Sequence, residues 1–193
     1  LVETLLEQTD GPIRRLSVPL RLRRVLVRDL DKARPVAVPR ELLTTNPQDI
    51  LGDPQTDVVV EVIGGEEPAR RFIQEALDAG KHVVTANKEV MAKHSPQLLA
   101  TAYQRGVDLR FEASVGAGIP LIGPLRDSLA ANRVAGIWAI INGTTNYVLT
   151  RMATEEMDFL SALALAQELG YAEPDPANDV EGTDAAFKLA ILA

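Results

Sequence analysis

The stretch from residue 57 to residue 80 restricts the fold more than any other part of the sequence. Residues 57–63 (Asp-Val-Val-Val-Glu-Val-Ile) form a nearly continuous β-branched run, which predicts a parallel strand buried on both faces. Gly64 and Gly65 follow and would let the backbone approach a ligand closely. Pro68 then opens a helix that ends at Gly80 and has apolar residues at helical spacing: Ala69, Phe72, Ile73, Ala76 and Leu77. This order predicts a βα unit.

The same pattern repeats directly afterwards. Residues 82–86 predict a second strand, Ser95-Pro96 predicts the start of a helix that runs to Arg105, and residues 109–112 predict a third strand. Strands that alternate with helices indicate a doubly wound, Rossmann-type α/β domain. Such sheets bind ligands beyond the carboxyl ends of their strands, which is where Lys88 follows its strand. The alternative for Lys88 is an ordinary solvated loop lysine.

The first part of the chain predicts the adenosine end of a dinucleotide site. Residues 1–8 have helical spacing, and residues 20–27 predict the strand whose end contacts the adenosine ribose in such folds. Arg28, Lys32 and Arg34 favour NADP, whereas Asp29 leaves NAD open and a solvated charged turn is the alternative. The Gly-x-Gly-x-x-Gly turn that should precede this helix is absent from the sequence. Because the helices at residues 1–8 and 188–193 also lack caps, we expect the sequence to be an excerpt, trimmed at both ends.

Residues 173–188 combine five carboxylates, two prolines and a glycine in one short segment. The prolines predict a stiff, extended loop that holds Glu173 and Asp179, and Thr183 is the predicted N-cap of the helix that follows. Asp184 and Lys188 are four residues apart on that helix, so they share one face. An acidic surface loop followed by an ordinary ion pair is the alternative interpretation.

The intervening residues predict a second, α+β domain. We expect a crossing helix at residues 120–129, a strand at residues 133–141 that contains Trp138, and a loop at residues 142–147 that opens a helix. A further amphipathic helix is predicted at residues 158–169, with Phe159, Leu163, Ala166 and Leu169 on its apolar face.

Composition excludes several classes of function. The net charge of −7, without a basic cluster beyond residues 21–24, argues against nucleic acid or an anionic membrane as partner and favours a small-molecule substrate. The absence of cysteine excludes disulfides and thiolate chemistry and is compatible with a reducing cytoplasm. No apolar run is long enough for a membrane span, and two histidines without cysteine predict no zinc site.

Six stretches, taken together, resemble the homoserine dehydrogenase family. They are Asp57-Val-Val-Val-Glu-Val-Ile-Gly-Gly65, Val84-Thr-Ala-Asn-Lys88, Glu112-Ala-Ser-Val-Gly-Ala-Gly-Ile-Pro120, Ile141-Asn-Gly-Thr-Thr-Asn-Tyr147, Gly170-Tyr-Ala-Glu-Pro-Asp-Pro176 and Asp179-Val-Glu-Gly-Thr-Asp-Ala-Ala-Phe-Lys188. The resemblance implies a dinucleotide-binding domain at residues 1–119 and a substrate-binding, catalytic and dimerisation domain at residues 120–193. It also implies a cytoplasmic homodimer that uses NADP or NAD to interconvert L-homoserine and L-aspartate 4-semialdehyde in threonine and methionine biosynthesis.

The residue patterns above and the resemblance together assign roles to individual residues of this sequence. The catalytic set is Lys88, Lys188 and Asp184, and the substrate-binding set is Glu173, Asp179, Gly143, Thr144 and Tyr171. The cofactor-binding set is Arg28, Lys32, Gly64, Gly65, Thr85, Asn87 and Lys88. A monovalent cation, sodium or potassium, would be bound by Glu112, Val115, Ala117 and Ile119, for which a glycine hinge is the alternative.

The chemistry expected of such an enzyme needs a group that moves the hydroxyl proton and stabilises alkoxide character. The matched motifs contain no histidine, so lysines must do this, and an amine beside a second cation can have a lowered pKa. Lys88 and Lys188 are therefore predicted to converge on one oxygen, and which of them transfers the proton stays open. The alternatives are a non-catalytic ligand-binding or dimerising fragment and another Rossmann reductase of amino-acid biosynthesis.

Overall fold

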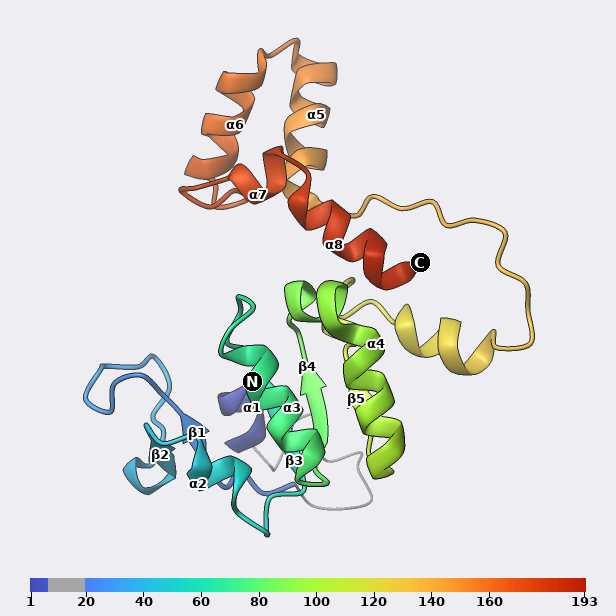
Figure 1. Cartoon of the computed structure of the whole chain (residues 1–193). Helices are drawn as coiled ribbons and strands as arrows, with labels where there is room; N and C mark the ends of the chain where they lie inside the picture. Colours follow the sequence, from blue (N-terminus) through green and yellow to red (C-terminus); the bar gives the residue numbers. More distant parts are fainter. Residues whose placement is uncertain (7–19) are drawn as a thin grey trace.

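The computed structural model describes residues 1–6 and 20–193 (Figure 1). Its strands are β1 (Val25–Leu26), β2 (Leu43–Thr44), β3 (Val58–Glu61), β4 (His82–Thr85) and β5 (Leu109–Arg110). Its helices are α1 (Val2–Leu6), α2 (Gln48–Leu51), α3 (Ala69–Asp78), α4 (Lys88–Arg105), α5 (Gly143–Glu155), α6 (Phe159–Glu168), α7 (Ala177–Val180) and α8 (Thr183–Leu192). Three tighter or wider turns complete the elements: η2 (Arg40–Leu42), η3 (Glu112–Ser114) and the π-helix η4 (Pro124–Ser128). The helix predicted at residues 1–8 is present as α1, and its last two residues lie outside the described ones.

The strands form two parallel sheets. β4 lies between β3 and β5, with Val58 opposite His82 and Val83 opposite Leu109, and β1 pairs with β2. The parallel α/β prediction is therefore confirmed. The predicted strand at residues 20–27 was too long, because only Val25 and Leu26 find a partner strand. The third predicted strand also ends early, at Arg110, where the chain turns into η3.

Helix α3 confirms its predicted pattern, since the five apolar residues named above are its buried ones. They pack with β4, β5 and α4 into the main core, which includes Ile73, Leu77, Val83, Met91 and Leu98. Burial of such aliphatic side chains contributes about 1.5–3 kcal/mol each, so this core stabilises the platform that carries the site.

The three-stranded sheet β3-β4-β5 is covered by the main core on one face, and in the described residues its opposite face is exposed. Val58, Val60 and Val84 point to this face, whereas Val59 and Val83 point into the core. The prediction of a strand buried on both faces was thus wrong for β3, because α3 and α4 belong to a core on one side only.

Helix α4 begins at Lys88, seven residues before the predicted start at Ser95. The Asn87 side chain caps it by accepting a hydrogen bond from the Val90 amide (3.0 Å). Pro96 lies inside the helix at an exposed position, where water can satisfy the carbonyl that its ring leaves without a donor. The Ser-Pro pair was therefore misread as a start signal, and Lys88 lies on the first turn of a helix rather than in a loop.

The second half is a group of helices joined to the first by a long extended segment (Figure 1). The crossing helix is shorter than predicted, and residues 133–141 form no strand within the described chain, with Trp138 89% exposed. A strand needs a hydrogen-bonding neighbour, and none of the described residues provides one. Helices α5 and α6 pack through Val148, Ala162 and Ala166, and Leu163 packs against this cluster. The predicted apolar face of α6 is therefore confirmed for Leu163 and Ala166 and wrong for Phe159 and Leu169, which are exposed.

Candidate active site

Helix α8 contacts the N-terminal end of α4, next to the carboxyl ends of β3 and β4 (Figure 1). This contact brings together residues almost a hundred positions apart in the sequence. The carboxyl ends of parallel strands are where open α/β sheets bind ligands, so the contact marks the candidate site.

Asp184 lies at the centre of this contact and is 2% exposed. Its Oδ1 accepts a hydrogen bond from Lys88 Nζ, and its Oδ2 accepts one from Lys188 Nζ (2.8 Å). Lys188 Nζ also donates to the Ile141 carbonyl (2.8 Å). The structure thus brings both predicted lysines to one carboxylate, and we call Lys88, Asp184 and Lys188 the central trio.

Two opposing effects act on the pKa of Asp184. Burial favours the neutral form, but the hydrogen bonds from Lys188, Lys88 and Asn142 outweigh it and lower the pKa of the carboxyl from 3.8 to about 2. Asp184 is therefore an anion at neutral pH, with a cation on each of its oxygens. Gly182, rather than the predicted Thr183, is the N-cap residue of α8, because its φ of 80° turns the chain into the helix.

Asn142 connects the central trio to a second carboxylate. Its Nδ2 donates to Asp184 Oδ2 (2.9 Å) and to Asp179 Oδ1 (2.7 Å). Asp179 lies on α7 and not on the extended loop predicted from the prolines, because residues 177–180 complete a helical turn after Pro176. Asn142 was missed as a site residue, although its motif was recognised.

The predicted substrate residues around α5 form a separate polar group. Gly143 and Thr144 are the first residues of α5, and Thr144 Oγ1 donates to the Tyr171 carbonyl (2.8 Å). The Tyr171 ring stacks on Tyr147 with ring centres 4.6 Å apart. The side chain of Glu173 is exposed, and no hydrogen bond or ion pair joins it to the central trio within the described residues.

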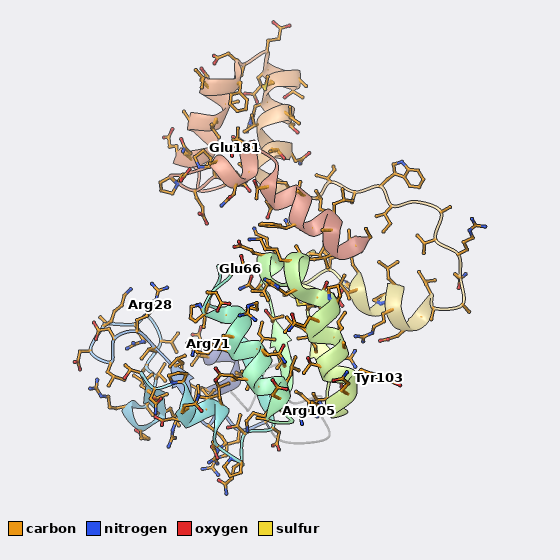
Figure 2. The ribbon with its side chains drawn as sticks, in the orientation of Figure 1. Arg28, Glu66, Arg71, Tyr103, Arg105 and Glu181 are labelled. Carbon is orange, nitrogen blue, oxygen red and sulfur yellow. The ribbon has the colours of Figure 1, made fainter. Side chains whose placement is uncertain are left out.

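The glycine turn after β3 lies next to the start of α4. Gly64 and Gly65 have φ of 79° and 72°, and a Cβ at either position would meet no atom within 4 Å. Asn87 Nδ2 holds the Gly65 carbonyl (2.7 Å), and Glu66, the next residue, accepts from Lys93 Nζ (2.7 Å) on α4. Figure 2 shows Glu66 at this end of α4. The open backbone fits the close approach of a dinucleotide.

Two buried side chains, those of Glu61 and Thr85, hold the backbone on either side of the glycine turn. Thr85 Oγ1 donates to Glu61 Oε2 (2.6 Å) and accepts from the Asn87 amide (2.9 Å), while Glu61 Oε1 accepts from the Ile63 amide (2.7 Å). Thr85 is almost fully buried, and its side chain holds the turn through these two hydrogen bonds. Its role in cofactor binding stays a prediction. Glu61 was missed, although a carboxylate inside an apolar strand was the signal.

The predicted adenosine end of the site lies in the loop after β1. Arg28 and Lys32 are exposed, and Figure 2 shows Arg28 projecting from this loop. Arg34 donates to the carbonyls of Asp29, Leu30 and Lys32, so its guanidinium is occupied inside the loop. Lys32 and Arg34 also line a cavity of about 250 Å³.

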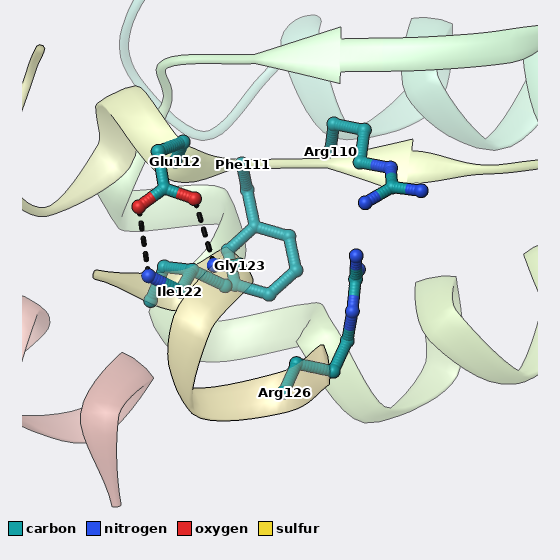
Figure 3. Close-up of a pocket in the computed structure, with 6 residues that line it drawn as sticks. All are labelled: Arg110, Phe111, Glu112, Ile122, Gly123 and Arg126. Atoms are coloured by element: carbon teal, nitrogen blue, oxygen red, sulfur yellow. Dashed lines mark hydrogen bonds between the residues drawn. The ribbon is translucent and has the colours of Figure 1, made fainter. Parts of the chain in front are cut away.

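The predicted cation ligands lie where β5 leads into the crossing segment. The Glu112 carboxylate accepts hydrogen bonds from the amides of Leu121, Ile122 (2.7 Å) and Gly123 (2.8 Å), two of which are drawn in Figure 3. These amides, that of Gly123 first, lower the pKa of Glu112. Hydrogen bonds made to the carbonyls of Val115, Ala117 and Ile119 are absent from the described part of the chain. The cavity beside Glu112 measures about 40 Å³.

Comparisons with known proteins agree along the whole chain. A family model described as "Homoserine dehydrogenase, NAD binding domain" matches residues 1–112, and one described as "Homoserine dehydrogenase" matches residues 120–193. The homoserine dehydrogenase of Bacillus subtilis (strain 168) is 46% identical over the whole chain, and that of a Synechocystis species is 52% identical over 90% of it. The chain covers 45% and 40% of these two relatives.

Solved structures give the same result. A homoserine dehydrogenase from Thiobacillus denitrificans matches 88% of the chain with a TM-score of 0.77 and 49% identity, and the chain covers 39% of it. A hyperthermophilic archaeal homoserine dehydrogenase in complex with NADPH matches 79% of the chain with a TM-score of 0.73 and 34% identity, and the chain covers 47% of it.

Proposed function

The chain belongs to the homoserine dehydrogenase family, and from this premise we propose that the intact protein interconverts L-homoserine and L-aspartate 4-semialdehyde with NADP or NAD. The chain spans less than half the length of the curated relatives it matches, so this activity is proposed for the protein as a whole. The observation that carries the proposal is the meeting of Lys88 and Lys188 on Asp184, beside the open glycine turn.

The glycine turn and the central trio would have separate roles, the first in binding the coenzyme and the second in acting on the substrate. Residues Gly64 and Gly65 would lie against the dinucleotide, which when bound supplies or accepts a hydride at its nicotinamide ring. When homoserine is oxidised, Lys188 or Lys88 would accept the hydroxyl proton as a neutral amine, and in the reverse reaction the ammonium so formed would return it. The other lysine, as an ammonium, would stabilise alkoxide character on the same oxygen. Asp184 supports this assignment because it holds both amines in place.

The opposite end of the substrate carries an ammonium group, which needs a carboxylate. Asp179 is the better supported candidate, since Asn142 ties it to Asp184, whereas Glu173 stays a candidate from the family resemblance. Gly143, Thr144 and Tyr171 would complete this side of the pocket.

For the coenzyme we propose a preference for NADP. Arg28 and Lys32 are exposed cations without an ion pair in the described residues, and they would attract a 2′-phosphate. Asp29, the residue that would favour NAD, has its carboxylate in a turn, where it accepts from the Asp31 amide (2.8 Å). The guanidinium of Arg34 already donates to three carbonyls, so Arg28 and Lys32 would bind the phosphate in its place.

The domain boundary that we propose between residues 119 and 120 is supported by the two family models, one of which ends at residue 112 and the other of which begins at residue 120. We propose a sodium or potassium ion at Glu112, Val115, Ala117 and Ile119. In the described residues the carbonyls of Val115, Ala117 and Ile119 accept no hydrogen bond and could bind the ion, which would share the Glu112 carboxylate with three backbone amides.

A homodimer is supported by the exposed apolar residues Val134, Ile137, Trp138 and Ile140. None of the described helices is long and apolar enough to cross a membrane, and a cytoplasmic location is proposed from the biosynthetic role.

A spectrophotometric assay of the intact protein tests the proposal. Homoserine-dependent formation of the reduced coenzyme is expected, faster at low coenzyme concentration with NADP than with NAD. Coenzyme binding without homoserine turnover in either direction would favour a non-catalytic ligand-binding role instead.

A further inference from the structure

Asn142 has two chemically different ends, and each end makes its own contacts. The oxygen, Oδ1, accepts from the Thr145 amide (2.8 Å) and from Thr145 Oγ1 (2.9 Å), which caps α5. The nitrogen, Nδ2, carries two hydrogens, and they go to two different carboxylates, those of Asp179 and Asp184. The residue is 8% exposed.

Capping alone does not explain an amide at this position. Serine, threonine and aspartate cap helices about as well as asparagine, because the cap needs only a side-chain acceptor. What asparagine adds is a neutral group that donates twice. Two carboxylates on different helices, α7 and α8, are thereby held by one nitrogen without an extra charge.

We propose that Asn142 is a positioning residue that fixes the distance between Asp179 and the central trio. This inference rests on the proposed function, in which Asp179 binds the substrate ammonium and the trio acts on the hydroxyl. Homoserine carries these two groups at a set separation along one chain. The Nδ2 bridge would therefore match the site to the length of an amino alcohol of this size.

The charges around Asn142 make the bridge sensitive to substitution. The groups that face it are Asp179 on α7, Asp184 and Lys188 on α8, and, through Asp184, Lys88 on α4. The negative charges of the two aspartates are balanced by the positive charges of the two lysines. An additional carboxylate at position 142 would unbalance this group and would repel both aspartates.

The substitution Asn142→Asp separates the two ends of the side chain. It keeps the capping oxygen and the size of the residue, but it replaces the double donor by an acceptor. We expect kcat/KM for homoserine to fall about 100-fold, the loss that a small misplacement of reacting groups causes. We also expect weaker homoserine binding by calorimetry, together with a coenzyme Kd that changes less than about twofold.

The pH dependence of the loss distinguishes positioning from a general structural defect. Three clustered carboxylates raise the pKa of one of them, and once protonated it can donate a hydrogen bond again. The deficit of Asn142→Asp should therefore shrink as the pH falls from about 7 to about 5. Asn142→Ser keeps a capping oxygen but adds no charge, so its deficit should not depend on pH in this way.

Asp158→Asn is the matched control. Asp158 caps α6 through its side chain, which accepts from the Ser161 amide (3.1 Å), and the substitution exchanges the same two residue types at an N-cap far from the trio in the hydrogen-bond network. Unchanged homoserine kinetics are expected.

Wild-type kcat/KM in Asn142→Asp would overturn the inference. If that variant does not fold, Asn142→Ser decides by the same kinetic and calorimetric measurements, and undiminished homoserine binding in it would also overturn the inference. An inactive wild-type protein would instead contradict the proposed function, so the two failures are distinguishable.

Discussion

The two halves of the described chain hold their lysines by different means. Lys88 begins α4, a helix that buries Val90, Met91, Leu98 and Ala102 in the main core. Lys188 belongs to α8, in which Asp184 is the buried residue, and its ammonium is held by that carboxylate and by the Ile141 carbonyl. Both ammonium groups meet Asp184, but they are carried differently: α4 is fixed by four buried apolar residues, whereas the apolar contribution of α8 to the same core comes from the partly buried Ile191 and Leu192. The second half thus depends more on polar contacts than the first.

The lysines differ in exposure as well. The side chain of Lys188 is 17% exposed and that of Lys88 is 44% exposed. Electrostatic interactions strengthen where water is excluded, so the more buried ammonium should contribute more to a charged transition state. The comparison therefore ranks Lys188 above Lys88 in the proposed reaction.

The largest effect is expected for Lys188→Ala. Loss of the more buried amine should lower kcat in the intact protein by at least about 1000-fold, combining lost proton transfer with lost charge stabilisation. Coenzyme affinity, measured by fluorescence titration, should change little, because the Lys188 ammonium contacts Asp184 and the Ile141 carbonyl and not the glycine turn. Leu189→Ala, at the exposed neighbouring position, is the control. Normal turnover in Lys188→Ala would remove this residue from the mechanism.

Lys88→Ala should cost less, about 100-fold in kcat, because its ammonium is more exposed. Helix α4 should remain intact, since Asn87 provides its cap. Steady-state kinetics of both lysine variants at saturating coenzyme would test the ranking directly. A greater loss for Lys88→Ala than for Lys188→Ala would show that exposure does not order the two amines.

The ion pairs of Asp184 should also make the stability of the protein depend on pH in acid. The pKa of Asp184 is lowered in the folded state from 3.8 to about 2, so its contribution to stability is present above about pH 4 and is lost as the pH falls toward 2. A shift of this size corresponds to about 2 kcal/mol. Urea unfolding between pH 5 and pH 2 should therefore show a steeper loss of stability for the wild type than for Asp184→Asn. Parallel curves for the two proteins would contradict the lowered pKa.

The same difference between the halves explains what could be predicted from the sequence. The apolar face of α3 was predicted residue by residue, because a βα unit buries its helix on its own strand. The strand predicted at residues 133–141 was wrong, because an apolar run forms a strand only where a neighbouring strand can pair with it, and the described residues provide none.

In the candidate site, too, some residues could be predicted from local sequence patterns, whereas others depend on contacts between distant elements. Asp184 and Lys188 could be paired from their spacing on one helix, and Lys88 was singled out by its position after a predicted parallel strand. The meeting of Lys88 with Lys188 was predicted only with the help of the family resemblance. The role of Asn142 depends on how α5, α7 and α8 meet, which no local pattern contains. Lys88 on the first turn of α4 was missed as a helical residue, since Pro96 suggested a later start.

The smallest effect is expected for Trp138→Ser in the 193-residue chain at concentrations at which it is monomeric, because the proposed homodimer would cover this segment. Trp138 is the one tryptophan of the sequence and lies on the extended segment, almost fully exposed, so its removal should change the free energy of unfolding by less than about 0.5 kcal/mol. Ile73→Ala, in the main core of the first half, is the comparison and should cost about 2–5 kcal/mol. Acrylamide quenching gives an independent measurement, since an exposed indole is accessible to the quencher. A protected indole, or a large loss of stability in Trp138→Ser, would show that the segment is covered in solution, and the contrast between a packed first half and an open second half would then fail.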